Sequence, residues 1–299
     1  MGLQLTKRAR RTAYGVMLAS SVMLLGACSA ETQAQADRWA MPANSPATEQ
    51  AVHIAELWKW AWVAALITGA LVWGLIFYAS WRFRRRSEDE IPVQTRYNLP
   101  LEVFYTIFPI MMVIVFFYWT VTVQGKIGIG DDQVDNPDHV VEVVGQQWSW
   151  TFNYVDEDAI DSPVVFTSGT GSDIPTLVLP VDQTTEFKLS SPDVIHSFWI
   201  PGFLMKMDVI PGQSGEDRNS FQVTPTETGT FMGKCTELCG VSHSRMLFNV
   251  EVVTEAEFDE HLRKLEDAGF SADAPLLGGE DAVTGAGGFE FKDETGGSE

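Results

Sequence analysis

The strongest chemical signal in the sequence is a cluster of side chains that bind soft metal ions. Two thiols, an imidazole and a thioether fall within twelve residues, at Cys235, Cys239, His243 and Met246. Sulfur ligands combined with imidazole favour copper over Mg²⁺ or Ca²⁺, which prefer oxygen. The ligands are three or four residues apart, a spacing that lets a loop between two strands turn them all inward. The segment therefore predicts a copper-binding loop.

The second cysteine changes the kind of copper site that this loop predicts. A mononuclear blue-copper site uses one Cys, two His and a weakly bound axial Met. Two thiolates can instead bridge two metal ions, which turns a one-copper loop into a two-copper loop. Such a site needs a further imidazole from elsewhere in the chain. Of the five His, His196 is best placed, because it lies at the edge of another predicted strand.

Other interpretations of these residues stay open on the sequence alone. Cys235 and Cys239 would also suit a local disulfide in an oxidising compartment, or half of a zinc site. Met246 by itself suits core packing, and His196 by itself suits a buried, hydrogen-bonded histidine. The combination favours copper, since the chain has only one further cysteine, Cys28.

Two uncharged apolar segments upstream predict a transmembrane hairpin over residues 58–123. Residues 61–81 and 103–123 are each 21 residues long, which as a helix crosses a hydrocarbon core of about 30 Å. The basic residues 82–86 between them should stay cytoplasmic. We therefore expect a multi-pass protein of the bacterial cell membrane, with its globular part on the outer, periplasmic or extracellular, face.

The N-terminus has the features of an export signal. Basic residues at 7–11 precede an apolar stretch over 13–25, followed by Leu25-Gly-Ala-Cys28. This last motif resembles the bacterial lipobox, in which the cysteine becomes the lipid-modified first residue of the mature protein. We expect residues 1–27 to be a lipoprotein signal peptide and residues 28–57 an extracytoplasmic segment. An uncleaved anchor with an incidental cysteine is the alternative.

The charge of the chain is distributed unevenly. The net charge is −20, yet residues 1–123 carry +3. Residues 124–299 contain nine Lys and Arg against 32 Asp and Glu, which gives −23. An acidic exposed domain repels nucleic acid and attracts basic partners over about a Debye length. Nucleic-acid binding is therefore not expected.

The part of the chain after the hairpin has the pattern of an all-β domain. Short apolar strands separated by Gly, Pro and Asp predict a Greek-key sandwich or barrel over residues 124–254. Residues 156–173 are acidic and contain Gly and Ser, so we expect a surface insertion between strands. A capping box at Thr254 predicts a helix over 255–269. Residues 270–299 are acidic and rich in Gly, which predicts a disordered tail.

Residues 58–253 closely resemble subunit II of cytochrome c oxidase. The matching elements are the two helices, the segments Gly145-Gln-Gln-Trp148-Ser-Trp150, Asp193-Val-Ile-His196 and Ile210-Pro-Gly, and the whole loop from Cys235 to Met246. The resemblance implies a two-helix transmembrane hairpin followed by an all-β cupredoxin-like sandwich. It also implies an oxidoreductase subunit with a binuclear copper centre, called CuA in that family.

The resemblance further implies a role for each ligand. Cys235 and Cys239 would bridge the two coppers, while His196 and His243 would each bind one of them. The Met246 sulfur would complete one copper and the backbone carbonyl of Glu237 the other. The Glu237 side chain would help to bind Mg²⁺ or Mn²⁺ at the boundary with subunit I.

The function implied is electron transfer from cytochrome c, soluble or membrane-bound, to haem in subunit I. Oxygen reduction to water and proton translocation would take place in subunit I. Trp148 would be the point where electrons enter, although the alternating Trp148, Trp150 and Phe152 also suit ordinary packing. Asp193 would help to steer a basic cytochrome. Glu102 would lie at the mouth of a proton pathway, although an interfacial charge is the simpler interpretation.

Partners implied by the resemblance are subunit I, the other oxidase subunits, a copper chaperone and membrane lipid. Four competing functions are each disfavoured by one feature. A purely structural subunit would not need the set of six copper ligands. A quinol oxidase subunit II would lack the copper ligands. Nitrous oxide reductase would need a second large catalytic domain. A copper-delivery lipoprotein would need neither Trp148 nor two closely spaced membrane segments.

Overall fold

The computed structural model describes residues 34–279 except 37, 88–89, 92, 130–132, 171–172 and 214. The predicted signal peptide, Cys28 and residues 280–299 lie outside the described residues. The chain divides into residues 1–43 and residues 44–299, and all of the elements below belong to the second unit.

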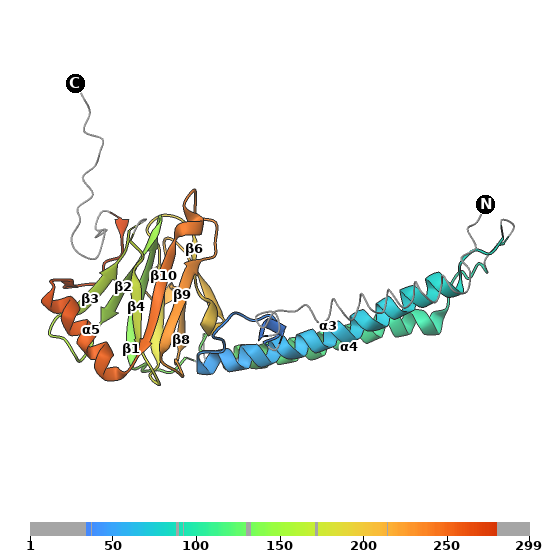
Figure 1. The fold of residues 1–299 in the computed structure, drawn as a ribbon, viewed down its shortest axis with the longest axis horizontal. Coiled ribbons are helices and arrows are strands. Elements are labelled where there is room, and N and C mark those ends of the chain that lie inside the picture. The colour runs from blue at the N-terminus through green and yellow to red at the C-terminus, as the bar shows by residue number, and fades with distance from the viewer. Residues whose placement is uncertain are drawn as a thin grey trace, which may run out of the picture. The chain divides into compact units, whose positions relative to one another are not determined.

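Two long apolar helices, α3 (Glu49–Arg82) and α4 (Leu99–Gln124), run side by side (Figure 1). α3 begins after Thr48, whose Oγ1 accepts a hydrogen bond from the Ala51 amide at 3.1 Å. Asn98 caps α4 in the same way through the Leu101 amide. Each helix is long and apolar enough to cross a membrane, and their large apolar side chains are exposed. The predicted spans 61–81 and 103–123 lie within these two helices.

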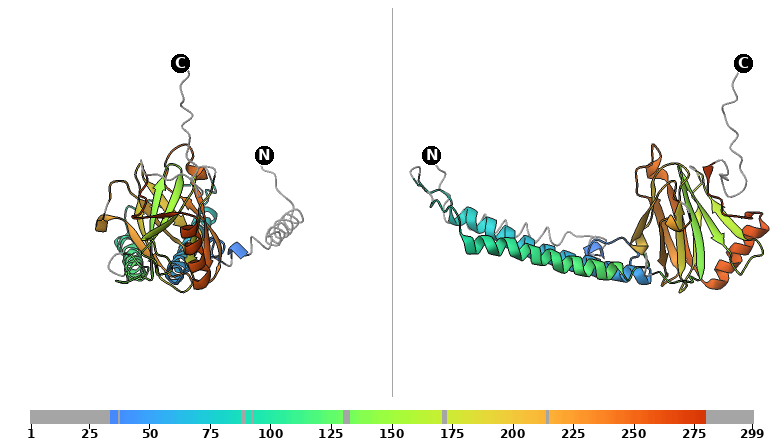
Figure 2. Two further views of the ribbon diagram at one scale, coloured as in Figure 1. Left: turned by 90° about the vertical axis from the view of Figure 1, so that its left-hand side faces the viewer. Right: turned by 180° about the vertical axis from the view of Figure 1, so that it is seen from behind.

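Two β-sheets pack face to face to form the rest of the unit, as the predicted sandwich requires (Figures 1 and 2). One sheet has the strand order β11-β3-β2-β1-β5-β8 and the other β4-β10-β9-β6-β7. Parallel pairing of β1 with β5 and of β4 with β10 requires the chain to cross between sheets, as in Greek-key folds. The strands are β1 (His139–Gln146), β2 (Ser149–Val155), β3 (Val164–Ser168), β4 (Thr176–Pro180), β5 (Thr185–Ser190), β6 (His196–Ile200), β7 (Met205–Val209), β8 (Ser220–Val223), β9 (Gly229–Cys235), β10 (Leu247–Val253) and β11 (Ser271–Ala272).

Aromatic side chains from both sheets fill the core. Phe198 of β6 stacks on Phe248 of β10, with ring centroids 4.8 Å apart, and the edge of Trp150 from β2 packs against Phe248. Trp150 and Phe152 are buried on the same side of β2, as the alternation in the sequence predicts. Such aromatic pairs add to the stabilisation from buried area. The metal-ligand candidates therefore stand on a rigid frame.

The sequence-based interpretation of two segments differs from the structure. Residues 156–173 were expected to form a surface insertion, but they contain β3, a fully buried strand of the six-stranded sheet. The start of the expected disordered tail, residues 271–279, contains β11 and contacts the sheet. The first segment is acidic and the second leads into Gly-rich sequence. Contacts with residues far away in the chain order both of them.

The helix α5 (Glu255–Asp267) covers one edge of the sandwich, beside β3 and β4. Thr254 caps it in the predicted capping box with Glu257. Beneath it, His139 Nδ1 lies 2.7 Å from Glu157 Oε2, and the His139 ring packs against Phe258. Burial alone would lower the pKa of His139, but hydrogen bonds to Glu157 and Gln183 and the nearby carboxylates outweigh it, so the pKa is raised.

This buried pair predicts a pH-dependent stability. A raised pKa means that the folded chain binds a proton that the unfolded chain releases above about pH 6.5. The stabilisation is complete below that pH and is lost as the pH rises through the raised pKa of His139. We expect His139→Asn to flatten this decline. Thermal midpoints of the copper-free chain in detergent, measured between about pH 6 and pH 9, check this, and equal slopes in both proteins would contradict it.

Candidate metal centre

Two strands, a short helix and the loop around it carry the predicted ligands at one end of the sandwich. His196 is the first residue of β6 and Cys235 is the last of β9. Antiparallel pairing of these strands sets Phe198 opposite Cys235, which brings the two ligands together. His243 opens the short helix η4 (His243–Arg245), and Met246 follows it directly before β10.

Backbone hydrogen bonds close the loop between β9 and β10. The Cys235 amide donates to the Met246 carbonyl at 3.0 Å. The Thr236 amide donates to the Ser197 carbonyl at 3.1 Å, which ties the loop to β6 as well. The ligands are therefore fixed by strand pairing at both ends of the loop.

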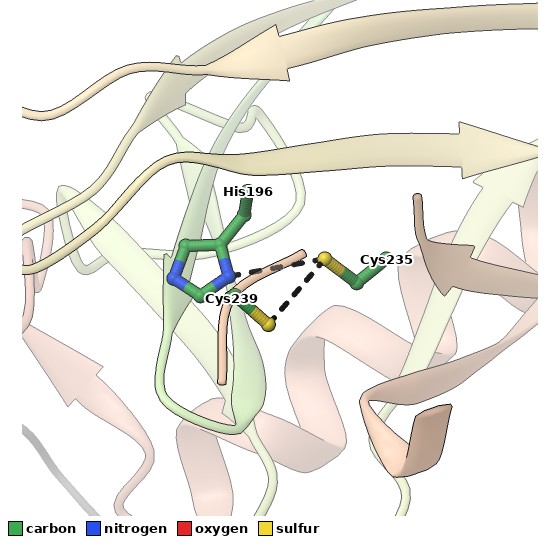
Figure 3. Close-up of side chains that lie close together, drawn as sticks. All are labelled: His196, Cys235 and Cys239. Atoms are coloured by element: carbon green, nitrogen blue, oxygen red, sulfur yellow. Dashed lines mark hydrogen bonds between the residues drawn. The ribbon is translucent and has the colours of Figure 1, made fainter. Parts of the chain in front are cut away.

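The side chains of His196, Cys235 and Cys239 point toward one another (Figure 3). The Cys235 Sγ lies 3.8 Å from the Cys239 Sγ and 3.9 Å from the His196 Nδ1. One donor atom from each of the three residues lies within 4.8 Å of the other two. All three residues are buried, so the site is shielded from solvent.

Three further donors surround the two sulfurs. The Cys239 Sγ lies 3.6 Å from the His243 Nδ1 and 3.8 Å from the Met246 Sδ. The Glu237 carbonyl oxygen lies 3.2 Å from the Cys235 Sγ. Each sulfur therefore has one imidazole and one weaker donor beside it.

This donor set suits a pair of copper ions better than the alternatives. A disulfide needs a sulfur separation of about 2.05 Å, whereas Cys235 and Cys239 are free and 3.8 Å apart. A structural zinc site is complete with four ligands. Here the two thiols and two imidazoles already make four, and Met246 and the Glu237 carbonyl raise the number of donors to six. Soft sulfur and imidazole are the ligands that copper prefers.

The two thiols differ in their acidity. Burial would raise the pKa of Cys235, but hydrogen bonds involving His196, the Ser197 backbone and Glu237 outweigh it and lower the pKa to about 6. Burial and the adjacent charge of Cys235 instead raise the pKa of Cys239. The copper-free site therefore favours a thiolate at Cys235, the form of cysteine that binds metals.

Asp193 orients the His196 ring, a role that sequence reasoning missed. Its Oδ1 lies 2.9 Å from the His196 Nε2, which leaves Nδ1 facing the sulfurs. Its Oδ2 accepts from the Gln147 amide at 2.7 Å. Burial would raise the pKa of Asp193, but the Gln147 amide and His196 lower it. The available signal was the Asp placed three residues before the ligand His, since carboxylates commonly orient metal-bound imidazoles.

Trp148 lies directly against the loop that carries the ligands. Its indole Nε1 donates to the Cys239 carbonyl at 3.2 Å. The loop residue beside it is Gly240, at φ +126°, and a Cβ there would lie 3.0 Å from the indole ring. Glycine is required for this close approach. Unlike Trp150, Trp148 is only partly buried, and it packs against the edge of the core.

The remaining predicted site residues lie apart from this cluster. The Glu237 side chain is exposed at the loop surface. Glu102 lies in the first turns of α4, where its Oε1 accepts from the Asn98 amide at 2.9 Å. Cys28 lies outside the described residues.

Comparisons with known proteins agree on one family. A family model described as the periplasmic domain of cytochrome c oxidase subunit II matches residues 139–253. A protein of Streptomyces avermitilis named "Probable cytochrome c oxidase subunit 2" is 44% identical over 271 residues, covering 80% of this chain and 82% of the relative. Cytochrome c oxidase subunit 2 of Corynebacterium glutamicum is 35% identical over 265 residues, covering 72% of this chain and 73% of the relative.

Among solved structures, the periplasmic domain of subunit II of a Bradyrhizobium japonicum cytochrome oxidase matches with 28% identity and a TM-score of 0.39. The match covers 46% of this chain and 100% of that one. The matches to the two sequence relatives cover most of each relative and most of this chain. With that identity and coverage, the chain belongs to the cytochrome c oxidase subunit II family.

Proposed function

We propose that this chain holds a binuclear copper centre that accepts electrons from a cytochrome c and passes them to haem in subunit I. Membership of the family makes the chain a subunit of a haem–copper oxidase. Oxygen reduction and proton translocation belong to subunit I. The observation that carries the proposal is the convergence of four further donors on two free, buried thiols, which gives six donors in all.

Each ligand has a place in this proposal. Cys235 and Cys239 would hold both copper ions, His196 and His243 would each bind one, and Met246 and the Glu237 carbonyl would complete them. When bound, the copper pair takes up and releases one electron at a time. The chain supplies a rigid frame, because strand pairing and buried aromatic side chains hold the ligands. A frame that does not rearrange favours fast electron transfer.

The surface around the copper loop supports docking of partner proteins. Leu238 is 78% exposed and Val241 is 91% exposed, although both are apolar. Exposed apolar side chains that lie close together are typical of interaction sites. Trp148 bridges this surface to the ligand Cys239 by a hydrogen bond. We assign Trp148 as the point where electrons enter, with a basic cytochrome c, soluble or tethered, as the donor to this acidic domain.

Further sites belong to the same proposal. The exposed side chain of Glu237 would bind Mg²⁺ or Mn²⁺ together with subunit I. The Mg²⁺ or Mn²⁺ content of an oxidase carrying Glu237→Gln tests this.

Cys28 would carry the lipid anchor, which mass spectrometry of the mature N-terminus tests. A copper chaperone and a thiol reductase would load the centre. If copper alone fully loads the reduced chain and the two thiols never oxidise to a disulfide, neither is needed.

Glu102 is proposed as the carboxylate at the entrance of a proton pathway in subunit I. Its hydrogen bond to the Asn98 amide is a competing structural role, and Glu102→Gln separates the two. The amide oxygen of Gln still accepts that hydrogen bond, but the side chain no longer binds and releases a proton. We expect proton uptake by the assembled oxidase to slow by about 100-fold, the low end of what a positioned proton-transfer group contributes. Unchanged uptake would show that Glu102 only caps the helix.

The test of the main proposal is copper content and electron paramagnetic resonance of the purified full-length chain in detergent. We expect two coppers per chain, with the hyperfine pattern of one electron shared equally by two copper nuclei. One copper with a mononuclear spectrum, or none that survives dialysis, would contradict the proposal and favour a copper carrier.

A further inference from the structure

The segment after α5 crosses the side of the six-stranded sheet that faces away from the core. β11 pairs with β3 at the edge of the sheet. On β2, Asn153 alternates with the core residues Phe152 and Tyr154, so its side chain points away from the core. Asn153 is nevertheless fully buried, because the segment leading to residue 279 lies over it.

Asn153 holds this segment at Leu276 through both ends of its amide. Its Oδ1 accepts from the Leu276 amide at 2.9 Å, and its Nδ2 donates to the Leu276 carbonyl at 3.2 Å. The same Nδ2 donates to the Glu142 carbonyl of β1 at 3.1 Å. A buried side chain with this many satisfied hydrogen bonds fixes the position of the backbone it binds.

Two glycines then contact the end of the sandwich that carries the copper ligands. The Gly279 amide donates to the Gln146 Oε1 at 3.2 Å. At Gly278, an added Cβ would lie 2.6 Å from the same Oε1 and 2.9 Å from the Pro192 Cγ. Residues 276–279, here called the C-terminal clip, therefore touch both the end of β1 and the loop before β6.

The two residues that the clip touches, Gln146 and Pro192, each come one position before a residue that orients a ligand. Gln147, after Gln146, donates its amide to the Asp193 Oδ2 and its side-chain Nε2 to the Cys239 carbonyl at 2.6 Å. Asp193, after Pro192, binds the Nε2 of His196. A shift of either segment would change the Gln147–Asp193 hydrogen bond and, through it, the His196 ring.

We propose that the C-terminal clip is a positioning element of the copper centre, which holds Gln146 and Pro192 together so that Asp193 fixes the orientation of His196. Groups outside the ligand shell commonly control metal affinity in this way, and their loss costs roughly 10–100-fold. The consequence for copper rests on the function proposed above, whereas the ordering of Gln147 is a property of the copper-free chain.

The two glycines provide a matched pair of variants. Gly278 has φ +82° and Gly279 has φ +75°, so alanine is strained by the backbone at both positions. Only at Gly278 would the new methyl group press on Gln146 and Pro192, since at Gly279 the nearest atom is the Pro192 Cβ at 3.7 Å. Gly278→Ala should therefore disturb the Gln147–Asp193 hydrogen bond, and Gly279→Ala should not.

The first readout is amide hydrogen exchange of the peptide containing Gln147 in the copper-free, full-length chain in detergent. We expect exchange about tenfold faster in Gly278→Ala than in Gly279→Ala. The second readout is copper affinity, expected to be about tenfold weaker in Gly278→Ala, with an altered hyperfine pattern from the histidine side of the centre. Two truncated chains repeat the comparison without any new side chain. The chain that ends at Ala272 lacks the clip, and the chain that ends at Gly279 keeps it.

The outcomes separate this proposal from the function on which it rests. Equal exchange within both pairs of variants would overturn the clip. Faster exchange with unchanged copper affinity and spectrum would overturn its role in positioning His196. A mononuclear spectrum in the unaltered chain would overturn the proposed function, and the exchange difference would then still report on the clip.

Discussion

Cys239→Ser is expected to abolish the shared-electron copper signal and to slow electron uptake from cytochrome c by more than about 100-fold. Cys239 lies between three other donors, with the Cys235 Sγ, the His243 Nδ1 and the Met246 Sδ all within 3.8 Å. Serine offers a hydroxyl that stays protonated at neutral pH and is a hard ligand, so it does not bridge copper. Copper content and electron paramagnetic resonance of the variant check this expectation.

The control is the third cysteine of the chain. Cys28→Ser removes a thiol from the predicted lipidation site and should leave two coppers per chain with an unchanged spectrum. The thermal midpoint of copper-free Cys239→Ser should stay close to that of the unaltered chain, because serine fills nearly the same volume. A shared-electron spectrum in Cys239→Ser would rule out the two-thiolate bridge.

Trp148→Phe is expected to slow electron transfer from cytochrome c by roughly 100-fold while leaving the copper spectrum intact. The indole donates a hydrogen bond to the Cys239 carbonyl and packs on Gly240, which puts it in direct contact with the ligand loop. Phenylalanine removes the N–H donor and retracts the ring edge. Losing this contact removes the route from the docked donor and misplaces the donor, which together are expected to cost on this order. Stopped-flow reduction of the assembled oxidase by reduced cytochrome c measures the rate.

Trp199→Phe is the matched control for this variant. Trp199 is also a partly buried tryptophan of the same domain, but its ring lies beside the ammonium groups of Lys206 and Lys234. Its replacement should leave the rate within about twofold of the unaltered oxidase. Equal rates in Trp148→Phe and Trp199→Phe would show that electrons enter elsewhere.

Local sequence was sufficient to predict much of this protein. The loop ligands could be found because Cys235, Cys239, His243 and Met246 lie within one short segment, and their chemistry indicates copper. The apolar runs predicted α3 and α4, since length and composition decide whether a helix can span a membrane. Short alternating strands predicted a β-sandwich, which the structure and the family match confirm.

Only the tertiary structure revealed the parts that depend on distant residues. β3 lies within an acidic segment and the C-terminal clip within a Gly-rich one, where composition predicts an insertion and a tail. Leu276 is ordered by Asn153, 123 residues earlier in the chain. Local propensity carries no information about such a partner, because the hydrogen bonds form only after the sheet has assembled.

The same reason explains why the role of Asp193 was missed. Its carboxylate gains a function only when folding brings the Gln147 amide and the His196 ring to its two oxygens. The sequence by itself predicted the copper ligands of the loop and the two helices that are long and apolar enough to cross a membrane, since both predictions follow from residue type and spacing. The tertiary structure decided how the ligands are oriented, because orientation depends on hydrogen bonds between segments that only the folded sheets bring together.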